Sequence, residues 1–148
     1  AYRALYDALV PLEINEVYQN LDIIITQELD YQVVSPESYS SIFRSLYLSS
    51  FLQPEHSQLI LKFLTQTIFK DKIPAEIPQD TLVAHKVGVY SASNKKNLFN
   101  DCGIIYAPNR PYILCMFVEG TNEEAQQHIS YISKMIYRYM EKVEIQRK

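Results

Sequence analysis

Lys86 is the residue whose type and setting most clearly suggest chemistry. It lies in a run that predicts a β-strand, two residues before Gly88, which is one of only three glycines in the chain. An ammonium group there would stabilise an anion, and the glycine would leave the strand surface open to a ligand. An exposed lysine on an edge strand gives the same pattern, because Lys-x-Gly is common by chance. Lys86 and Gly88 therefore indicate a functional site only in combination with the segments around them.

The histidines give little support for metal or acid–base chemistry. His56, His85 and His128 are scattered along the chain and predict no metal site, and no cofactor is implied. His85 adjoins Lys86 on the strand, so its side chain should point to the opposite face. We expect it to be structural. Asp101 opens a later strand after a loop and is interpreted as a turn or hydrogen-bonding residue rather than a catalytic acid.

Cys102 and Cys115 are the only cysteines. They are too few for a disulfide scaffold and lack metal-ligand spacing, which favours two buried free thiols. A disulfide is the alternative, because both fall on consecutive predicted strands around a tight turn.

Composition restricts the classes of function. The 148 residues, 47% hydrophobic and 21% charged, predict one globular domain with a sizeable core. A formal charge of −3 leaves no basic surface for nucleic acid, and three glycines argue against a glycine-rich phosphate loop. No apolar run approaches the roughly 20 residues that span a bilayer. The visible chain also begins without an export signal.

Helix signals dominate residues 1–80. Ser35-Pro36-Glu37 and Pro54-Glu55 each have the form of a helix start. Residues 71–80 contain two prolines between charges and are interpreted as a surface connection. In the C-terminal part, Thr121-x-x-Glu124 has the form of a capping box before a long amphipathic helix.

Strand signals dominate between residues 81 and 118. Residues 81–90, 101–106 and 112–118 are predicted strands, with a polar loop at 91–97 and a tight turn at 107–111. The order predicts an α+β fold with helices on one side of an antiparallel sheet. Residues 112–118 are apolar on both faces, as in a central strand, yet a simple meander would leave them at an edge. Something further should pair there.

Several segments together resemble the end of a class A β-lactamase-like, penicillin-binding serine hydrolase. They are Ala84-His85-Lys86-Val87-Gly88, Asn100 to Tyr106, Pro111 to Leu114, and the Thr-capped helix. The resemblance implies a β-lactamase/transpeptidase-like fold. Residues 1–148 would be the C-terminal portion of one domain, and its N-terminal strands and nucleophile helix would be missing from this chain.

The chain departs from the family pattern in its nucleophile motifs. Ser-Asp-Asn is absent, and no predicted helix start carries the family's Ser-x-x-Lys. The same spacing at Ser93–Lys96 falls in the predicted loop between two strands. Val87 replaces the usual Thr or Ser, and Ser91 or Ser93 would be the substitute hydroxyl. The deacylating Glu-x-x-Leu-Asn loop is also missing, and Glu28 is the nearest candidate acid.

The resemblance assigns roles to four consecutive residues. Lys86 would be catalytic, placing its ammonium group at the active-site cleft. Val87, Gly88 and Val89 would bind substrate, with the Val89 N–H as one oxyanion donor. The second donor and the serine would come from the missing part.

The expected function is therefore part of a serine hydrolase or acyltransferase that acts on β-lactam or peptidoglycan-like amides, with this chain inactive alone. The expected partners are that substrate and either the missing segment or another chain at the open edge. The family works outside the cytoplasm, so an extracytoplasmic location is expected. The alternatives are a degenerate binding domain with the same fold, and a stable piece completed by another polypeptide or by self-association.

Overall fold

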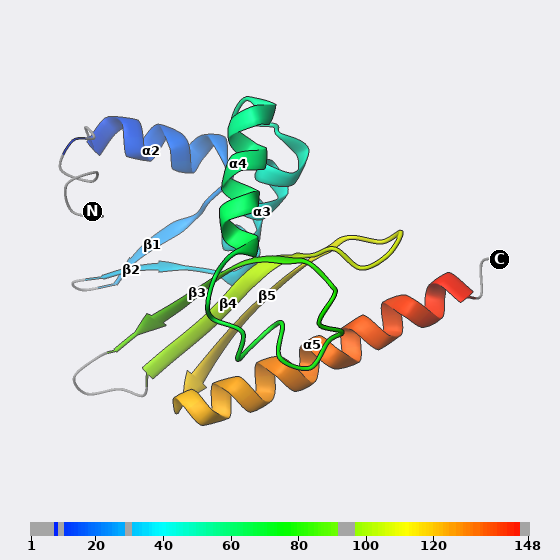
Figure 1. Ribbon diagram of the computed structural model, residues 1–148. Helices are drawn as coiled ribbons and strands as arrows, with labels where there is room; N and C mark the ends of the chain where they lie inside the picture. The colour runs from blue at the N-terminus through cyan, green and yellow to red at the C-terminus, as the bar shows by residue number, and fades with distance from the viewer. Residues whose placement is uncertain (1–7, 9–10, 29–30, 92–96, 146–148) are drawn as a thin grey trace.

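The computed structural model describes residues 8, 11–28, 31–91 and 97–145 (Figure 1). The elements follow in the order α2 (Pro11–Asn20), β1 (Ile25–Glu28), β2 (Tyr31–Val34), α3 (Pro36–Leu48), α4 (Pro54–Thr65), β3 (Val83–Tyr90), β4 (Asn97–Ile105), β5 (Tyr112–Gly120) and α5 (Asn122–Ile145). This confirms the predicted α+β class. Among the helices of these residues, none is both long and apolar enough to cross a membrane.

β3, β4 and β5 form an antiparallel meander with β4 in the middle. In its register Lys86 lies opposite Cys102, which in turn lies opposite Cys115. The three predicted strands are confirmed, although β4 begins at Asn97 instead of residue 101. Backbone pairing with the neighbouring strands extends β4 through Asn97 and Asn100, although Asn is disfavoured in strands.

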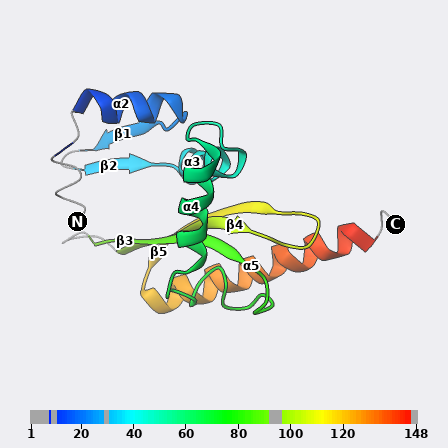
Figure 2. The same ribbon diagram turned by 45° about the horizontal axis from the view of Figure 1, so that its top comes forward.

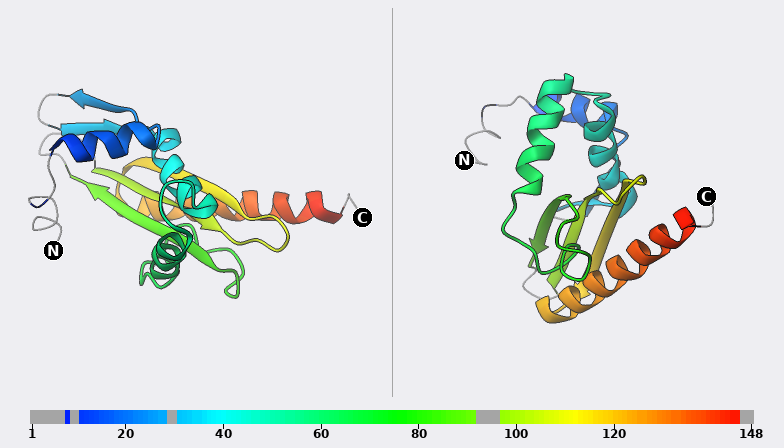
Figure 3. Two further views of the ribbon diagram at one scale, coloured as in Figure 1. Left: turned by 90° about the horizontal axis from the view of Figure 1, so that it is seen from above. Right: turned by 45° about the vertical axis from the view of Figure 1, so that its right-hand side comes forward.

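Helices cover both faces of this sheet, so the expectation that they lie on one side is wrong. The right-hand view of Figure 3 shows α4 and α5 on opposite sides, and Figure 2 shows α3 on the side away from α5. Neighbouring strand residues alternate between the two cores: Ala84 packs with α3 and α4, whereas Val83 packs with α5. This arrangement explains why β5 is apolar on both faces.

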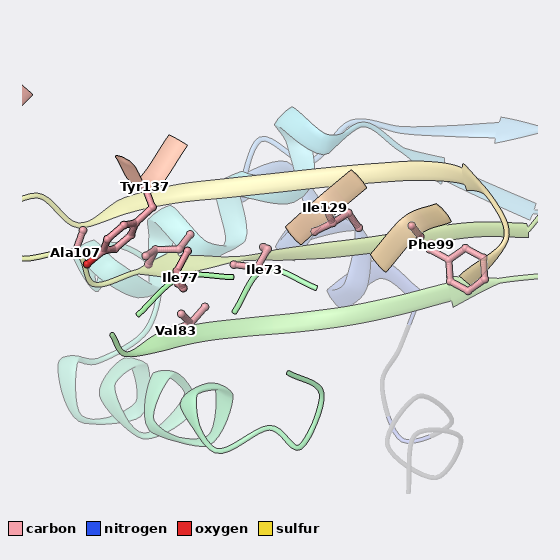
Figure 4. Packing of buried hydrophobic residues seen from close by; sticks show 9 residues of the cluster. Ile73, Ile77, Val83, Phe99, Ala107, Ile129 and Tyr137 are labelled. Carbon is pink, nitrogen blue, oxygen red and sulfur yellow. The ribbon is translucent and has the colours of Figure 1, made fainter. Parts of the chain in front are cut away.

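The 71–80 connection contributes to the core, contrary to the surface segment predicted. Ile73 and Ile77 are 0% and 6% exposed and belong to the same cluster as Val83 and Ile129 (Figure 4). Even Lys72 is only 3% exposed, and its ammonium group donates to Asp71. The prolines and charges follow the end of α4 at Thr65, but they do not keep this segment at the surface.

All three predicted helix starts are confirmed, and two of them have a side-chain cap, whereas α4 begins at Pro54 without one. The Ser35 hydroxyl accepts the N–H of Ser38 at 3.1 Å, which caps α3. The N–H of Thr121 donates to Glu124 Oε2 at 2.8 Å, and the N–H of Glu124 donates to Thr121 Oγ1 at 3.2 Å. This reciprocal pair is the predicted capping box at the start of α5.

The N-terminal half also contains a β-hairpin that was not predicted. β1 and β2 pair antiparallel, with Thr26 opposite Val33. The β-branched run from Ile23 to Thr26 favours a strand, and it interrupts the mainly helical part between α2 and α3.

Cys102 and Cys115 form a disulfide, so the prediction of two free thiols is wrong. The two residues are directly opposite each other, and their Cα atoms are 4.1 Å apart. The bond joins the central strand to β5, under the helices of the α3 and α4 face.

β5 pairs only with β4 among the residues that the structure describes. From Tyr112 to Val118 its side chains are all half-buried. Helices cover both faces of β5, and the remaining exposure is at the edge away from β4. On α5, Tyr131 and Tyr139 are 58% and 64% exposed, so an apolar face of this helix is also left open.

Candidate functional site

Alternation along β3 divides the four predicted site residues between two faces. Lys86 and Gly88 lie on the α3 and α4 side, since Lys86 is opposite Cys102 of that core. The side chains of Val87 and Val89 project to the α5 side. Lys86 is exposed and Val87 is half-buried. The backbone of Val89, and not its side chain, is therefore what could share a site with the lysine.

In the part of the chain that the structure describes, β3 pairs only with β4, and the backbone of Val89 faces its other, open edge. The N–H of Tyr106 donates to Leu82 O at 2.9 Å, so even-numbered residues of β3 turn their peptide groups toward β4. The short Cα distance between Cys102 and Cys115 gives the same parity, because it marks a pair without mutual backbone hydrogen bonds. The odd-numbered residues thus present their N–H and C=O groups outward.

The Lys86 ammonium group lies at this outer edge of β3. Its Nζ donates to Val87 O, which places the ammonium group beside the edge where the Val89 N–H also points. A cation and an N–H donor together favour an anionic or developing oxyanion group in an extended ligand. The Lys86 ammonium group and the Val89 N–H are therefore the described groups at β3 that can act on a substrate.

Asn100 was missed by the sequence analysis. It is opposite Gly88 on β4 and lies on the same face, and a methyl group at Gly88 would be 2.6 Å from its Oδ1. The Asn100 carboxamide therefore covers the glycine that was expected to leave the strand open. Only the strand register brings the two residues together, and the sequence pattern alone does not reveal it.

His85 lies on the α5 face, opposite to Lys86, as expected. Its Nδ1 is 2.7 Å from Asp101 Oδ1, and both side chains are 0% exposed. Asp101 Oδ2 accepts the N–H of Ile73 at 3.0 Å. Of the two interpretations, Asp101 is thus the hydrogen-bonding residue, and it is buried in the middle of β4 instead of lying at its start or at a turn.

The other candidates lie away from β3 or beyond what the structure describes. His56 and His128 are exposed, and Ser91 is exposed at the end of β3. Ser93 lies outside the described residues, as does the side chain of Glu28. Within the described residues, no group of three or more His, Cys, Asp or Glu side chains could hold a metal ion.

Ionisable groups around the α5 face are perturbed by their neighbours. Burial, followed by the nearby Tyr137, raises the pKa of Tyr112 to about 12. A hydrogen bond from Lys134, together with one from Ser130, lowers the pKa of Glu76. These groups stabilise the packing of α5 and lie on the opposite side of the sheet from Lys86.

Comparisons with known proteins agree with the fold of the chain. A profile described as the beta-lactamase enzyme family matches residues 1–140, whereas no curated protein matches the chain significantly. The solved structure of PBP-A has a TM-score of 0.74 at 21% identity, over 88% of this chain and 51% of that chain.

Two further solved structures are similarly close in fold. TLA-1 extended-spectrum beta-lactamase has a TM-score of 0.74 at 17% identity, over 87% of this chain and 54% of its own. A class A beta-lactamase from Bacteroides cellulosilyticus has a TM-score of 0.74 at 20% identity, over 86% and 53%. The chain thus spans about half the length of these structures, and at such identities they show its fold alone. Through the profile match over nearly all its residues, the chain belongs to the beta-lactamase enzyme family.

Proposed function

We propose that this chain forms part of a serine hydrolase or acyltransferase that acts through a serine acyl-enzyme on β-lactam or peptidoglycan-like amides. The observation that carries the proposal is the open edge of β3, where the Lys86 ammonium group and the outward N–H of Val89 lie together. Family membership supplies the reaction class, since the beta-lactamase profile matches almost the whole chain.

Each group at this edge has a defined task in such a reaction. The Lys86 ammonium group attracts the substrate anion and favours proton transfer around the serine. The Val89 N–H donates one of two hydrogen bonds to the oxyanion, and the segment with the serine supplies the other. Val87 and Gly88 form the strand surface beside the substrate. Because the nucleophile lies outside this wall, the chain alone is inactive.

A fluorescent penicillin tests the proposal. A longer protein that includes the upstream coding sequence should become labelled at a serine outside residues 1–148, while the present chain should not. Lys86→Ala in the longer protein should slow labelling by about 10²-fold or more. Lys62→Ala, at an exposed position in the last turn of α4, is the control and should label normally.

Two results would contradict the proposal. One is an unlabelled longer protein with an intact fold. The other is labelling of the present chain, and Ser93→Ala would then show whether the loop serine is the nucleophile.

A non-catalytic domain that binds cell-wall material is the second candidate. Val87 favours it, because the position lacks the hydroxyl that would help hold a substrate carboxylate. Loss of both serine motifs from the upstream coding sequence, together with binding of peptidoglycan fragments, would replace the enzyme by this domain.

We further propose an extracytoplasmic location, supported by the disulfide, because such bonds persist in oxidising compartments. Alkylation of thiols in intact cells tests this. Cys102 and Cys115 should resist alkylation until a reductant is added after lysis. Ready alkylation of both thiols in the cell would place the protein in a reducing compartment.

A further inference from the structure

A buried ionisable pair lies directly beneath the proposed site. His85 and Asp101 have no exposed side-chain surface, although charged and imidazole groups are rarely buried without a specific partner. A well-packed apolar pair of similar volume would often serve stability equally well. The presence of the pair thus calls for a role beyond filling the core.

The pair connects four separate elements. Asp101 Oδ2 accepts the N–H of Ile73 at 3.0 Å, so Oδ1 is left for His85, whose Nδ1 must donate because a carboxylate only accepts. The carbonyl of Ile73 in turn accepts the Ser133 hydroxyl at 2.8 Å. β3, β4, the 71–80 connection and α5 are thereby joined by three hydrogen bonds in the core.

His85 fits into the sheet because the residue opposite it on β4 has no side chain. Gly103 is opposite His85, and a methyl group there would overlap its Cβ and lie 2.8 Å from its Cα. Only glycine allows β3 to approach β4 so closely at this position. The imidazole Nε2 is buried and has no hydrogen-bond partner among the described residues, so Nδ1 is the atom that serves the pair.

β3 needs such a connection, because among the described residues it is an edge strand that pairs with β4 alone. His85 immediately precedes Lys86, and Asp101 is opposite Val87. We propose that His85 and Asp101 are positioning residues, which hold β3 in place and so keep the Lys86 ammonium group and the Val89 N–H aligned. The alignment part of this inference rests on the proposed function above.

Amide hydrogen exchange in the full chain tests whether the pair holds β3. His85→Leu leaves the Asp101 carboxylate without its donor, and the amides of Ile73, Lys86 and Gly88 should exchange roughly tenfold to a hundredfold faster. Amides of α4 should stay protected. His85→Asn should restore slow exchange, because its Nδ2–H can take the place of the imidazole Nδ1–H.

Val83→Ala is the matched control, since it removes buried apolar contacts from the same face of β3 and leaves the pair intact. It should accelerate exchange broadly. If His85→Leu does not fold, Asp101→Asn gives the same comparison, because it keeps the shape but leaves one acceptor oxygen for two donors. Unchanged exchange at β3, or the same broad pattern as Val83→Ala, would overturn the proposal.

Acylation by a fluorescent penicillin in the longer protein tests alignment. His85→Leu should lower the limiting acylation rate at least tenfold with little change in the half-saturating concentration, and His85→Asn should restore the rate. An unchanged rate in His85→Leu, or failure of His85→Asn to restore it, would refute positioning. If the unsubstituted protein is not acylated at all, the proposed function fails, and the exchange pattern alone decides whether the pair holds β3.

Discussion

Two glycines on facing strands have different surroundings. A methyl group at Gly88 would meet the Asn100 carboxamide, which is the end of a flexible side chain. A methyl group at Gly103 would meet backbone atoms, Ala84 O at 2.5 Å and His85 Cα at 2.8 Å. The first neighbour can rotate away, whereas the second requires β3 to shift.

Gly103→Ala should therefore lower the free energy of unfolding by about 1–3 kcal/mol, as overpacking does, while Gly88→Ala should change it by less than about 1 kcal/mol. Urea denaturation of the two variants measures both values. Equal losses would mean that the close approach at Gly103 is unimportant for folding.

Tyr112 provides a prediction at alkaline pH. Its pKa is about 12 in the folded chain, compared with about 10 for an unperturbed tyrosine. The folded state therefore binds this proton more tightly, so its contribution to stability is complete below pH ~10 and is lost as the pH rises toward ~12. Ultraviolet absorbance measures phenolate formation in the unsubstituted chain and in Tyr112→Phe. The difference between the two titration curves should lie near pH ~12. Loss of an ordinary tyrosine signal near pH ~10 would contradict this prediction.

The sequence predicted the orientation of His85 but not its partner. Orientation follows from local alternation along a strand, which a sequence pattern reports directly. Pairing with Asp101 depends on the register between β3 and β4, and a shift of one residue would have placed the two side chains on different faces. The relation between Asn100 and Gly88 was hidden for the same reason.

At the scale of elements, the 71–80 connection was the clearest error. Two prolines and several charges indicated a surface segment, but Ile73 and Ile77 pack between the sheet and α5. The hydrogen bonds of Ile73 to Asp101 and Ser133 satisfy its buried backbone. Helix starts were predicted well because a cap depends on neighbouring residues, whereas this segment is placed by distant partners.

Ile73→Ala should lower the free energy of unfolding by about 2–5 kcal/mol, because it opens a cavity at a fully buried position. Ile68→Ala is the control, since Ile68 is 86% exposed and should change stability by at most about 0.5 kcal/mol. Chemical denaturation compares the two. A small effect at Ile73 would restore the interpretation of a surface segment.

At the scale of the whole molecule, the pattern of β5 predicted its burial between two layers, whereas a neighbour at its outer edge stays a prediction. Apolar residues on both faces match the two helical layers, and its outer edge is open among the described residues. We expect a further strand of the same domain, or another chain, to pair there.

The isolated chain should self-associate through this edge as its concentration rises, which sedimentation velocity can measure. Glu119 is exposed, and its N–H points outward by the parity of the ladder. Glu119→Pro should weaken association by removing that donor without breaking the ladder to β4. Glu119→Ala, which keeps the N–H, is the control. A chain that stays monomeric throughout would argue against an adhesive edge.

The disulfide has a consequence for the unfolded chain as well. Cys102 and Cys115 are the same rung of the β4–β5 ladder, so the bond closes a small covalent ring around the turn at Ala107 to Pro111. A one-residue slip would turn every side chain of β5 over and exchange its two cores. In an oxidised chain Cys102 and Cys115 remain joined even when the chain is unfolded, so the register between β4 and β5 is already fixed when folding begins.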